Sequence, residues 1–181
     1  MSAAVLIERF LLAMPVIHRL FRPGTMIKAT FASLVLLALF VSSPARAQLL
    51  QTQTLSLQAA KTMAAAAEAE ARENGWNVAI AIVDAAGELI LFQRLDQTQP
   101  ASVDIAVGKA RTAARYRRPT KVLEEAVAGG RTVLLALDGV PLEGGLPIVV
   151  DGRVIGAVGV SGVTSQQDAQ VAQAAIDALV R

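Results

Sequence analysis

The stretch that decides the fold is Gly144–Gly162, which reads GGLPIVVDGRVIGAVGVSG. Two apolar runs, 147–150 and 154–160, flank the dipeptide Asp151-Gly152. Asp-Gly favours the type I′ turn of a two-residue β-hairpin, because both of its residues tolerate a positive φ. Since hairpins join antiparallel neighbours, the stretch predicts an antiparallel sheet.

A second hairpin is expected upstream. The runs 76–83 and 88–95 are rich in β-branched and apolar residues, and the segment Asp84–Gly87 separates them. Segments with helical periodicity lie before, between and after the hairpins: Leu55–Asn74, Ala101–Arg117, Val122–Ala128 and Ser165–Leu179. This order lacks βαβ alternation, which excludes a Rossmann-type sheet and predicts an α/β (α+β) fold with helices flanking an antiparallel sheet.

Two local features refine this expectation. Ser165 and Asp168 have capping-box spacing, which predicts the start of the last helix. Three glycines of the last strand do not have the G-x-G-x-x-G spacing, so they predict close backbone packing in place of phosphate binding; they are Gly156, Gly159 and Gly162.

The first 47 residues are typical of an export leader. Lys28 precedes the ten-residue apolar run 32–41, and Ala45-Arg46-Ala47 follows as an A-x-A cleavage site. The run is shorter than the roughly 20 residues that span a bilayer, so no stable membrane span is expected after cleavage. Met26 opens a complete signal peptide of ordinary length, which leaves Met1 and Met26 open as the start. We expect a mature domain of residues 48–181, in the periplasm or secreted.

Removing the leader changes the charge. The whole chain has 17 Lys/Arg and 15 Asp/Glu, whereas residues 48–181 keep 12 and 14 of them, a net charge of −2. The basic balance therefore belongs to the leader, and nucleic acid is not an expected partner. The chain has no cysteine, and its single histidine is His18, so the mature part lacks thiol nucleophiles, histidine-ligated metal sites and Ser-His-Asp triads.

A basic segment is the strongest local candidate for a binding site. Arg111, Arg115 and Arg118 fall on one stripe of the helix, while Lys109, Thr112 and Tyr116 fall on another. The stripe predicts either an anionic ligand, such as the carboxylates of a tetrapyrrole or a sugar acid, or a solvated face. A further alternative is pairing of the stripe with acidic residues of neighbouring elements, namely Glu68, Glu70, Glu124 or Glu125.

Tyr116 is the only tyrosine of the chain. A phenolate can be an axial ligand of haem iron, and nearby cations favour the ionised phenol. Tyr116 is therefore a candidate metal ligand, with Lys109, Arg111 and Arg115 as candidate partners of the haem propionates.

Three ordered blocks carry a family resemblance: Arg94-x-Asp96, the segment Ala101–Thr120 and the segment Gly144–Gly162, followed by Gln167-Asp168. They resemble the GlcG/HbpS family of haem-binding proteins, and the module is also similar to the C-terminal domain of PduO-type corrinoid adenosyltransferases. The resemblance covers essentially the whole mature chain. It implies a profilin-like α-β-α sandwich that assembles into homo-oligomers.

The resemblance also implies a cofactor and its binding residues. The cofactor is haem, with haem degradation or redox sensing beside a partner in some exported members. The K-A-x-T-A block maps onto Lys109–Ala113, and the R-x-D block onto Arg94 and Asp96. A family threonine is associated with haem iron, which makes Thr112 the first candidate and Thr120 the second. Where the family usually has Phe, this chain has Tyr116.

Three functions remain open on this basis, the third being a non-catalytic assembly module whose Gly-rich strands and Ala-rich helices serve subunit packing. The first is an exported haem-binding protein, more a binding protein than an enzyme. The alternative is an accessory protein that binds or processes a small organic acid of the glycolate type beside the turn at Gly144–Pro147.

Overall fold

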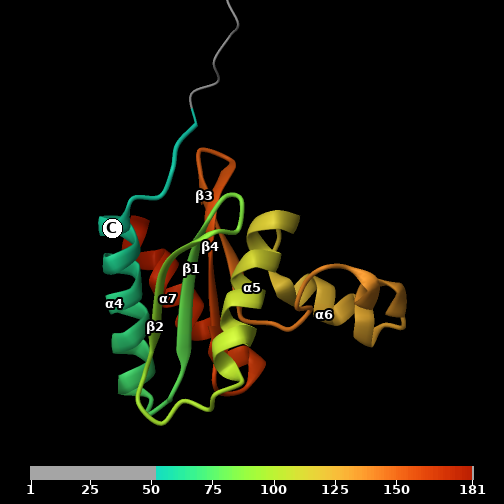
Figure 1. Ribbon diagram of the computed structural model, residues 1–181, viewed down its shortest axis with the longest axis horizontal. Coiled ribbons are helices and arrows are strands. Elements are labelled where there is room, and N and C mark those ends of the chain that lie inside the picture. Colours follow the sequence, from blue (N-terminus) through green and yellow to red (C-terminus); the bar gives the residue numbers. More distant parts are fainter. Residues whose placement is uncertain (1–51, 181) are drawn as a thin grey trace, which may run out of the picture. The chain divides into compact units, whose positions relative to one another are not determined.

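Two hairpins build one four-stranded antiparallel sheet in the computed structural model, which describes residues 52–180. The strands are β1 (Ala79–Asp84), β2 (Leu89–Arg94), β3 (Gly145–Val150) and β4 (Arg153–Ser161), in the order β2-β1-β4-β3 (Figure 1). β1 and β4 are thus the central strands and join the two hairpins. The antiparallel sheet predicted from the hairpin signals is confirmed.

Helices cover both faces of the sheet. α4 (Leu57–Glu73) and α7 (Ser165–Val180) pack together on one face, and α5 (Ser102–Tyr116) lies on the other. α6 (Thr120–Ala128) and the short 3₁₀ helix η1 (Thr132–Ala136) pack against each other and project from the α5 side (Figure 1). The expected α-β-α sandwich is confirmed.

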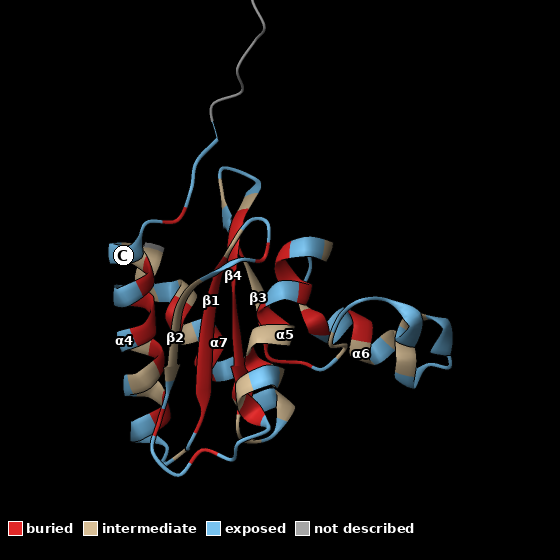
Figure 2. Ribbon diagram, viewed as in Figure 1, coloured by how far each residue is buried: buried red, intermediate tan, exposed pale blue. Residues whose placement is uncertain are grey.

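The larger core lies between the sheet and the pair α4 and α7. Because side chains alternate along a strand, Ile80 and Ile82 of β1 face this core together with Val158 and Val160 of β4. α4 meets them with small side chains and Met63, all fully buried. The central strands are accordingly buried along nearly their whole length (Figure 2).

The opposite face is packed more closely. α5 presents alanines, among them Ala106 and Ala110, to the alanines of β1 and β4. Gly145 and Gly159 pair across β3 and β4, and a Cβ at either position would collide with the backbone of α5. The glycines therefore allow the helix to lie directly on the strands, as the sequence predicted for Gly159.

Turns and caps follow the local sequence with one correction. Asp151 and Gly152 both have positive φ, as a type I′ turn requires. The predicted capping box of Ser165 and Asp168 is wrong: Thr164 and Gln167 cap α7 reciprocally, one residue earlier. Asp168 does not take part in this cap, because its carboxylate points toward the interior.

The leader 1–47, with both candidate starts, lies outside the described residues, and the domain boundary at residue 48 stays a prediction. Between residues 52 and 180, no helix is long and apolar enough to cross a membrane.

Gly159→Ala is expected to lower the free energy of unfolding by about 1–3 kcal/mol, because the added methyl group meets the backbone of Ala106 and Ala110 and forces α5 away from the sheet. The urea midpoint measures this loss. Gly129→Ala, at a C-cap of ordinary φ, is the matched control and should change the midpoint less. An equal shift in both variants would contradict the close packing of α5.

Candidate functional site

Two of the three arginines of the predicted basic stripe hold the β1–β2 turn, whereas Arg118 donates to the carbonyl of Tyr116. Arg111 Nε donates to the carbonyl of Gly87 at 3.2 Å, and Arg115 Nε donates to that of Ala86 at 3.0 Å. Arg115 also pairs with Glu88 at 3.4 Å and with Asp138 at 3.6 Å. These partners differ from the four glutamates considered in the sequence, because the turn folds back over α5.

The same turn is stabilised from within. Asp84 Oδ1 accepts hydrogen bonds from the amides of Ala86 at 2.8 Å and Glu88 at 2.9 Å. Gly87 has a φ of +89° and lies against the Arg115 side chain. The side chains of Arg111 and Arg115 thus already have hydrogen-bond partners in the turn. A ligand carboxylate would have to compete with the carbonyls of the turn.

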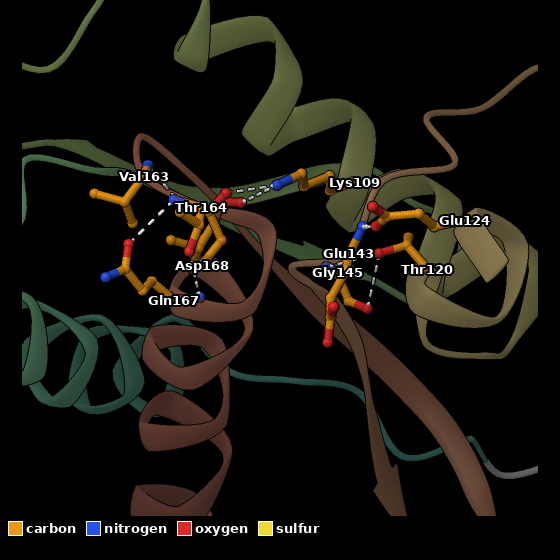
Figure 3. Close-up of polar contacts among 10 residues, drawn as sticks. Lys109, Thr120, Glu124, Glu143, Gly145, Val163, Thr164, Gln167 and Asp168 are labelled. Atoms are coloured by element: carbon orange, nitrogen blue, oxygen red, sulfur yellow. Dashed lines mark hydrogen bonds and ion pairs between the residues drawn. The ribbon is translucent and has the colours of Figure 1, made fainter. Parts of the chain in front are cut away.

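Lys109 has a different environment from its neighbours on α5. Its side chain is buried, and Nζ forms an ion pair of 2.7 Å with Asp168 and donates to the carbonyl of Val160 at 3.0 Å (Figure 3). The residue is 2% exposed, and so is Asp168. A propionate could therefore reach Lys109 only by displacing Asp168.

Burial raises the pKa of the Asp168 carboxyl above its ordinary value. The hydrogen bond and the charge of Lys109 act in the opposite direction, as does the amide of Val163, which donates to Oδ1 at 3.2 Å. The carboxylate therefore depends on Lys109 to remain ionised inside the protein.

The segment Glu143–Gly145 fits between this ion pair and α6 (Figure 3). Gly144 has a φ of +120°, and a Cβ there would lie 2.8 Å from Lys109 Nζ. On the other side, Thr120 Oγ1 accepts from the amide of Gly145 at 2.9 Å, and Glu124 accepts from the amide of Glu143. Thr120, the second candidate for an iron ligand, is fully buried in this contact.

Lys121 completes the attachment of α6. Its ammonium lies 3.1 Å from the buried carboxylate of Glu143, and this carboxylate raises the pKa of Lys121. The sequence did not single out Glu143. Asp168 appeared only as a capping residue and as part of the family block with Gln167. No local pattern therefore indicated that Glu143 pairs with Lys121 or that Asp168 pairs with Lys109.

Thr112 and Tyr116 both contact the loop that follows η1. Thr112 is buried; its Oγ1 donates to the carbonyl of Gly108 at 2.7 Å and accepts from the amide of Val140 at 2.8 Å. The Tyr116 hydroxyl donates to the carbonyl of Asp138 at 3.4 Å, a long hydrogen bond. Of these two candidate iron ligands, Tyr116 is held by the weaker hydrogen bond.

Exposed apolar residues precede the loop that Tyr116 contacts. None of the residues of η1 is buried, although four of the five are apolar. Val133 is 71% exposed and Leu135 is 60% exposed. We call the exposed apolar residues of α6, η1 and the following loop the apolar lobe: Val122, Val133, Leu135, Leu137 and Leu142.

Arg94, the remaining candidate, lies at the end of the edge strand β2, opposite Ala79. It is exposed. The structure therefore brings Thr112 and Tyr116 together at one loop, places Lys109 and Thr120 on the two sides of Gly144-Gly145, and leaves Arg94 apart. The ligand roles of all these residues stay predictions.

Comparison with known proteins identifies the family. The family model described as haem degrading protein HbpS-like matches residues 55–177. The chain belongs to this HbpS-like family. Protein GlcG of Escherichia coli (strain K12) is 49% identical over 108 residues, which cover 59% of this chain and 81% of that protein.

Solved structures agree with this assignment. Protein ORFY of Klebsiella pneumoniae is 38% identical with a TM-score of 0.70, and the match covers 74% of this chain and 95% of that one. HbpS of Streptomyces reticuli, in a double mutant, is 32% identical with a TM-score of 0.67, over 75% and 96%. A PduOC complex with haem is 30% identical with a TM-score of 0.66, over 70% and 95%. The predicted family and fold are both confirmed.

Lys109→Met is expected to lower the free energy of unfolding at pH 7 by about 3–5 kcal/mol, because it leaves the Asp168 carboxylate buried without its cation. Without Lys109 the pKa of Asp168 rises further, so the folded protein binds a proton more readily than the unfolded chain does. The loss of unfolding free energy in Lys109→Met therefore becomes smaller as the pH falls through this raised pKa toward about 4. Urea titrations at several pH values measure it.

The double variant Lys109→Met/Asp168→Asn tests the cause. It removes both charges, so it should recover much of the stability at pH 7 and lose the pH dependence. Arg72→Met, which breaks the surface pair with Glu68, should leave the midpoint nearly unchanged. A loss in Lys109→Met that is equal at pH 4 and pH 7 and is not rescued by Asp168→Asn would refute the assignment.

Proposed function

We propose that this chain is an exported haem-binding protein and that the apolar lobe, together with Tyr116, receives the haem. The observation that carries the proposal is the PduOC complex with haem, which shares the fold at 30% identity over 95% of its length. The description of the matching family points in the same direction. Haem degradation and redox sensing beside a partner are finer versions of the same proposal.

The chemistry of the described residues fits a porphyrin. A porphyrin is a flat apolar ring, and several large apolar side chains exposed in one part of a fold are typical of a site for a ligand or a partner. Val133 and Leu135 are the most exposed apolar side chains of the lobe. Tyr116 donates a hydrogen bond to Asp138, in the loop that follows η1. Because that hydrogen bond is long, the phenol can leave it at little cost and turn to iron.

The propionates need cations that the fold does not already use. Arg111 and Arg115 are bonded to the β1–β2 turn, and Lys109 is bonded to Asp168. Arg131 immediately precedes η1 and is exposed, and its side chain forms no ion pair with another residue of the range 52–180. We therefore add Arg131 as a candidate partner of a propionate.

Bound haem would supply one-electron and oxygen chemistry, which the protein's own side chains cannot provide. The part of the chain is then to bind the ring on the lobe, to orient it through Tyr116 and to neutralise its carboxylates. This division of labour supports a binding protein more than an enzyme with its own catalytic residues. The predicted homo-oligomer is part of the proposal, because copies that pack over the lobe would shield the ring from water.

Hemin added to residues 48–181, purified without a histidine tag, is expected to give a saturable Soret shift. Leu135→Asp should weaken binding about tenfold or more, because it places a carboxylate in the apolar surface that contacts the ring. Leu57→Asp is the matched control, because Leu57 is 53% exposed on α4, away from the lobe. This variant should bind hemin as tightly as the unchanged protein does.

Two further variants assign the iron ligand. Tyr116→Phe should move the Soret band if the phenolate binds iron, whereas Thr112→Val should leave it unchanged and only loosen the loop at Val140. Unchanged spectra in both variants would remove both ligand assignments. A titration that matches free hemin would refute the haem proposal and favour the small organic acid, for which glycolate-induced thermal stabilisation is the readout.

The export proposal predicts a mature protein that begins at Gln48. Intact-mass spectrometry of the protein recovered outside the cytoplasm measures this terminus. Ala45→Glu should retain the leader, because signal cleavage requires a small residue there, whereas Arg46→Glu, at the variable position of the A-x-A site, should still be cleaved. Recovery of the full leader on the unchanged chain would contradict the proposal.

A further inference from the structure

A hollow of about 330 Å³ lies where the end of α4, the start of β1 and the end of β2 meet. Its lining includes Arg72, Trp76, Asn77, Asp96 and Gln97. The hollow shares no residue with the apolar lobe or with the Lys109–Asp168 pair, so the proposed function does not account for it. Its volume lies within the range of small-molecule sites.

The charges that line the hollow favour a cation. Within residues 52–180, the Asp96 carboxylate forms no ion pair, whereas Arg72 is neutralised by Glu68 at 2.6 Å. The C-terminal end of α4, which borders the hollow, carries the negative partial charge of the helix dipole. Asp96 is thus an exposed anion without an ion-pair partner among residues 52–180, and it lies near the negative end of the α4 dipole.

Trp76 adds an aromatic surface. It packs against the larger core, is half-buried and is one of the residues that line the hollow. Backbone bonds fix its position, since its amide donates to the carbonyl of Ala71 at 2.8 Å. The face of an indole attracts ammonium groups more strongly than any other side-chain ring.

Gln97 has an unusual backbone for its residue type. Its φ is +64°, in a turn closed by Thr98, whose amide and hydroxyl both donate to the carbonyl of Leu95. This position of a turn ordinarily carries Gly or Asn, so a long side chain is kept here at a conformational cost. The amide oxygens of Gln97 and Asn77 supply acceptors for N–H groups at the lining of the hollow.

We propose that this hollow binds a small organic ammonium ion, with Asp96 as its counter-ion and Trp76 as its aromatic contact. A metal ion fits less well, because no group of three or more His, Cys, Asp or Glu side chains gathers anywhere in residues 52–180. An alkylammonium carrying N–H groups uses all three features, since the carboxylate balances its charge, the amide oxygens accept its protons and the indole covers its alkyl part.

Trp76 is the only tryptophan of the chain, so its fluorescence reports directly on the hollow. Propylammonium chloride is expected to change this emission saturably, relative to sodium chloride at equal ionic strength. Asp96→Asn should raise the apparent Kd about tenfold or more, because the ammonium loses its counter-ion. Asp151→Asn is the matched control: Asp151 is exposed in the β3–β4 turn at the other end of the sheet, and Asn tolerates its positive φ.

Three results would overturn the proposal: no saturable change, an equal response in Asp96→Asn, or the same response to sodium propionate. The last would mean that the hollow prefers a carboxylate through Arg72. Hemin binding is measured by the Soret band and involves other residues, so the haem proposal and this one can fail independently.

Discussion

The buried ion pair between Lys109 and Asp168 is the constraint to which much of the remaining structure is fitted. It joins α5 and α7, two helices that pack on opposite faces of one sheet. Neither charge could be buried alone, because the loss of hydration would exceed any local gain. The ion pair and the hydrogen bond to the carbonyl of Val160 therefore constrain how the two helices lie relative to each other.

That arrangement explains the glycines next to it. Gly144 passes beside the ammonium and Gly145 beside the backbone of α5, and neither position has room for a side chain. Gly159 pairs with Gly145 and lets the same helix approach the strands. With α5 fixed in this way, its C-terminal half holds the β1–β2 turn through Arg111 and Arg115 and the loop at Val140 through Thr112.

The fold could be predicted from the sequence because its signals are local. Asp151-Gly152 specifies a hairpin, and helical periodicity and glycine caps delimit the helices. The partners of α5 could not be predicted, since periodicity tells which side chains share a face but not what lies opposite that face. Lys109 reads as a surface residue of a basic segment, and only the structure shows that Asp168, 59 residues later, faces it in the interior.

The apolar lobe follows from the way α6 is attached. α6 is tied to the body mainly by polar contacts of Thr120, Lys121 and Glu124 with the segment at Glu143. Because these bonds hold α6 in place, the apolar side chains of η1 are not needed for the core and remain on the surface. Exposed apolar area lowers solubility without stabilising the fold, so its presence beside the only tyrosine of the chain is best explained by a partner that covers it. In the proposed function a haem ring supplies that cover and also uses the phenol, whose hydrogen bond to the carbonyl of Asp138 is long.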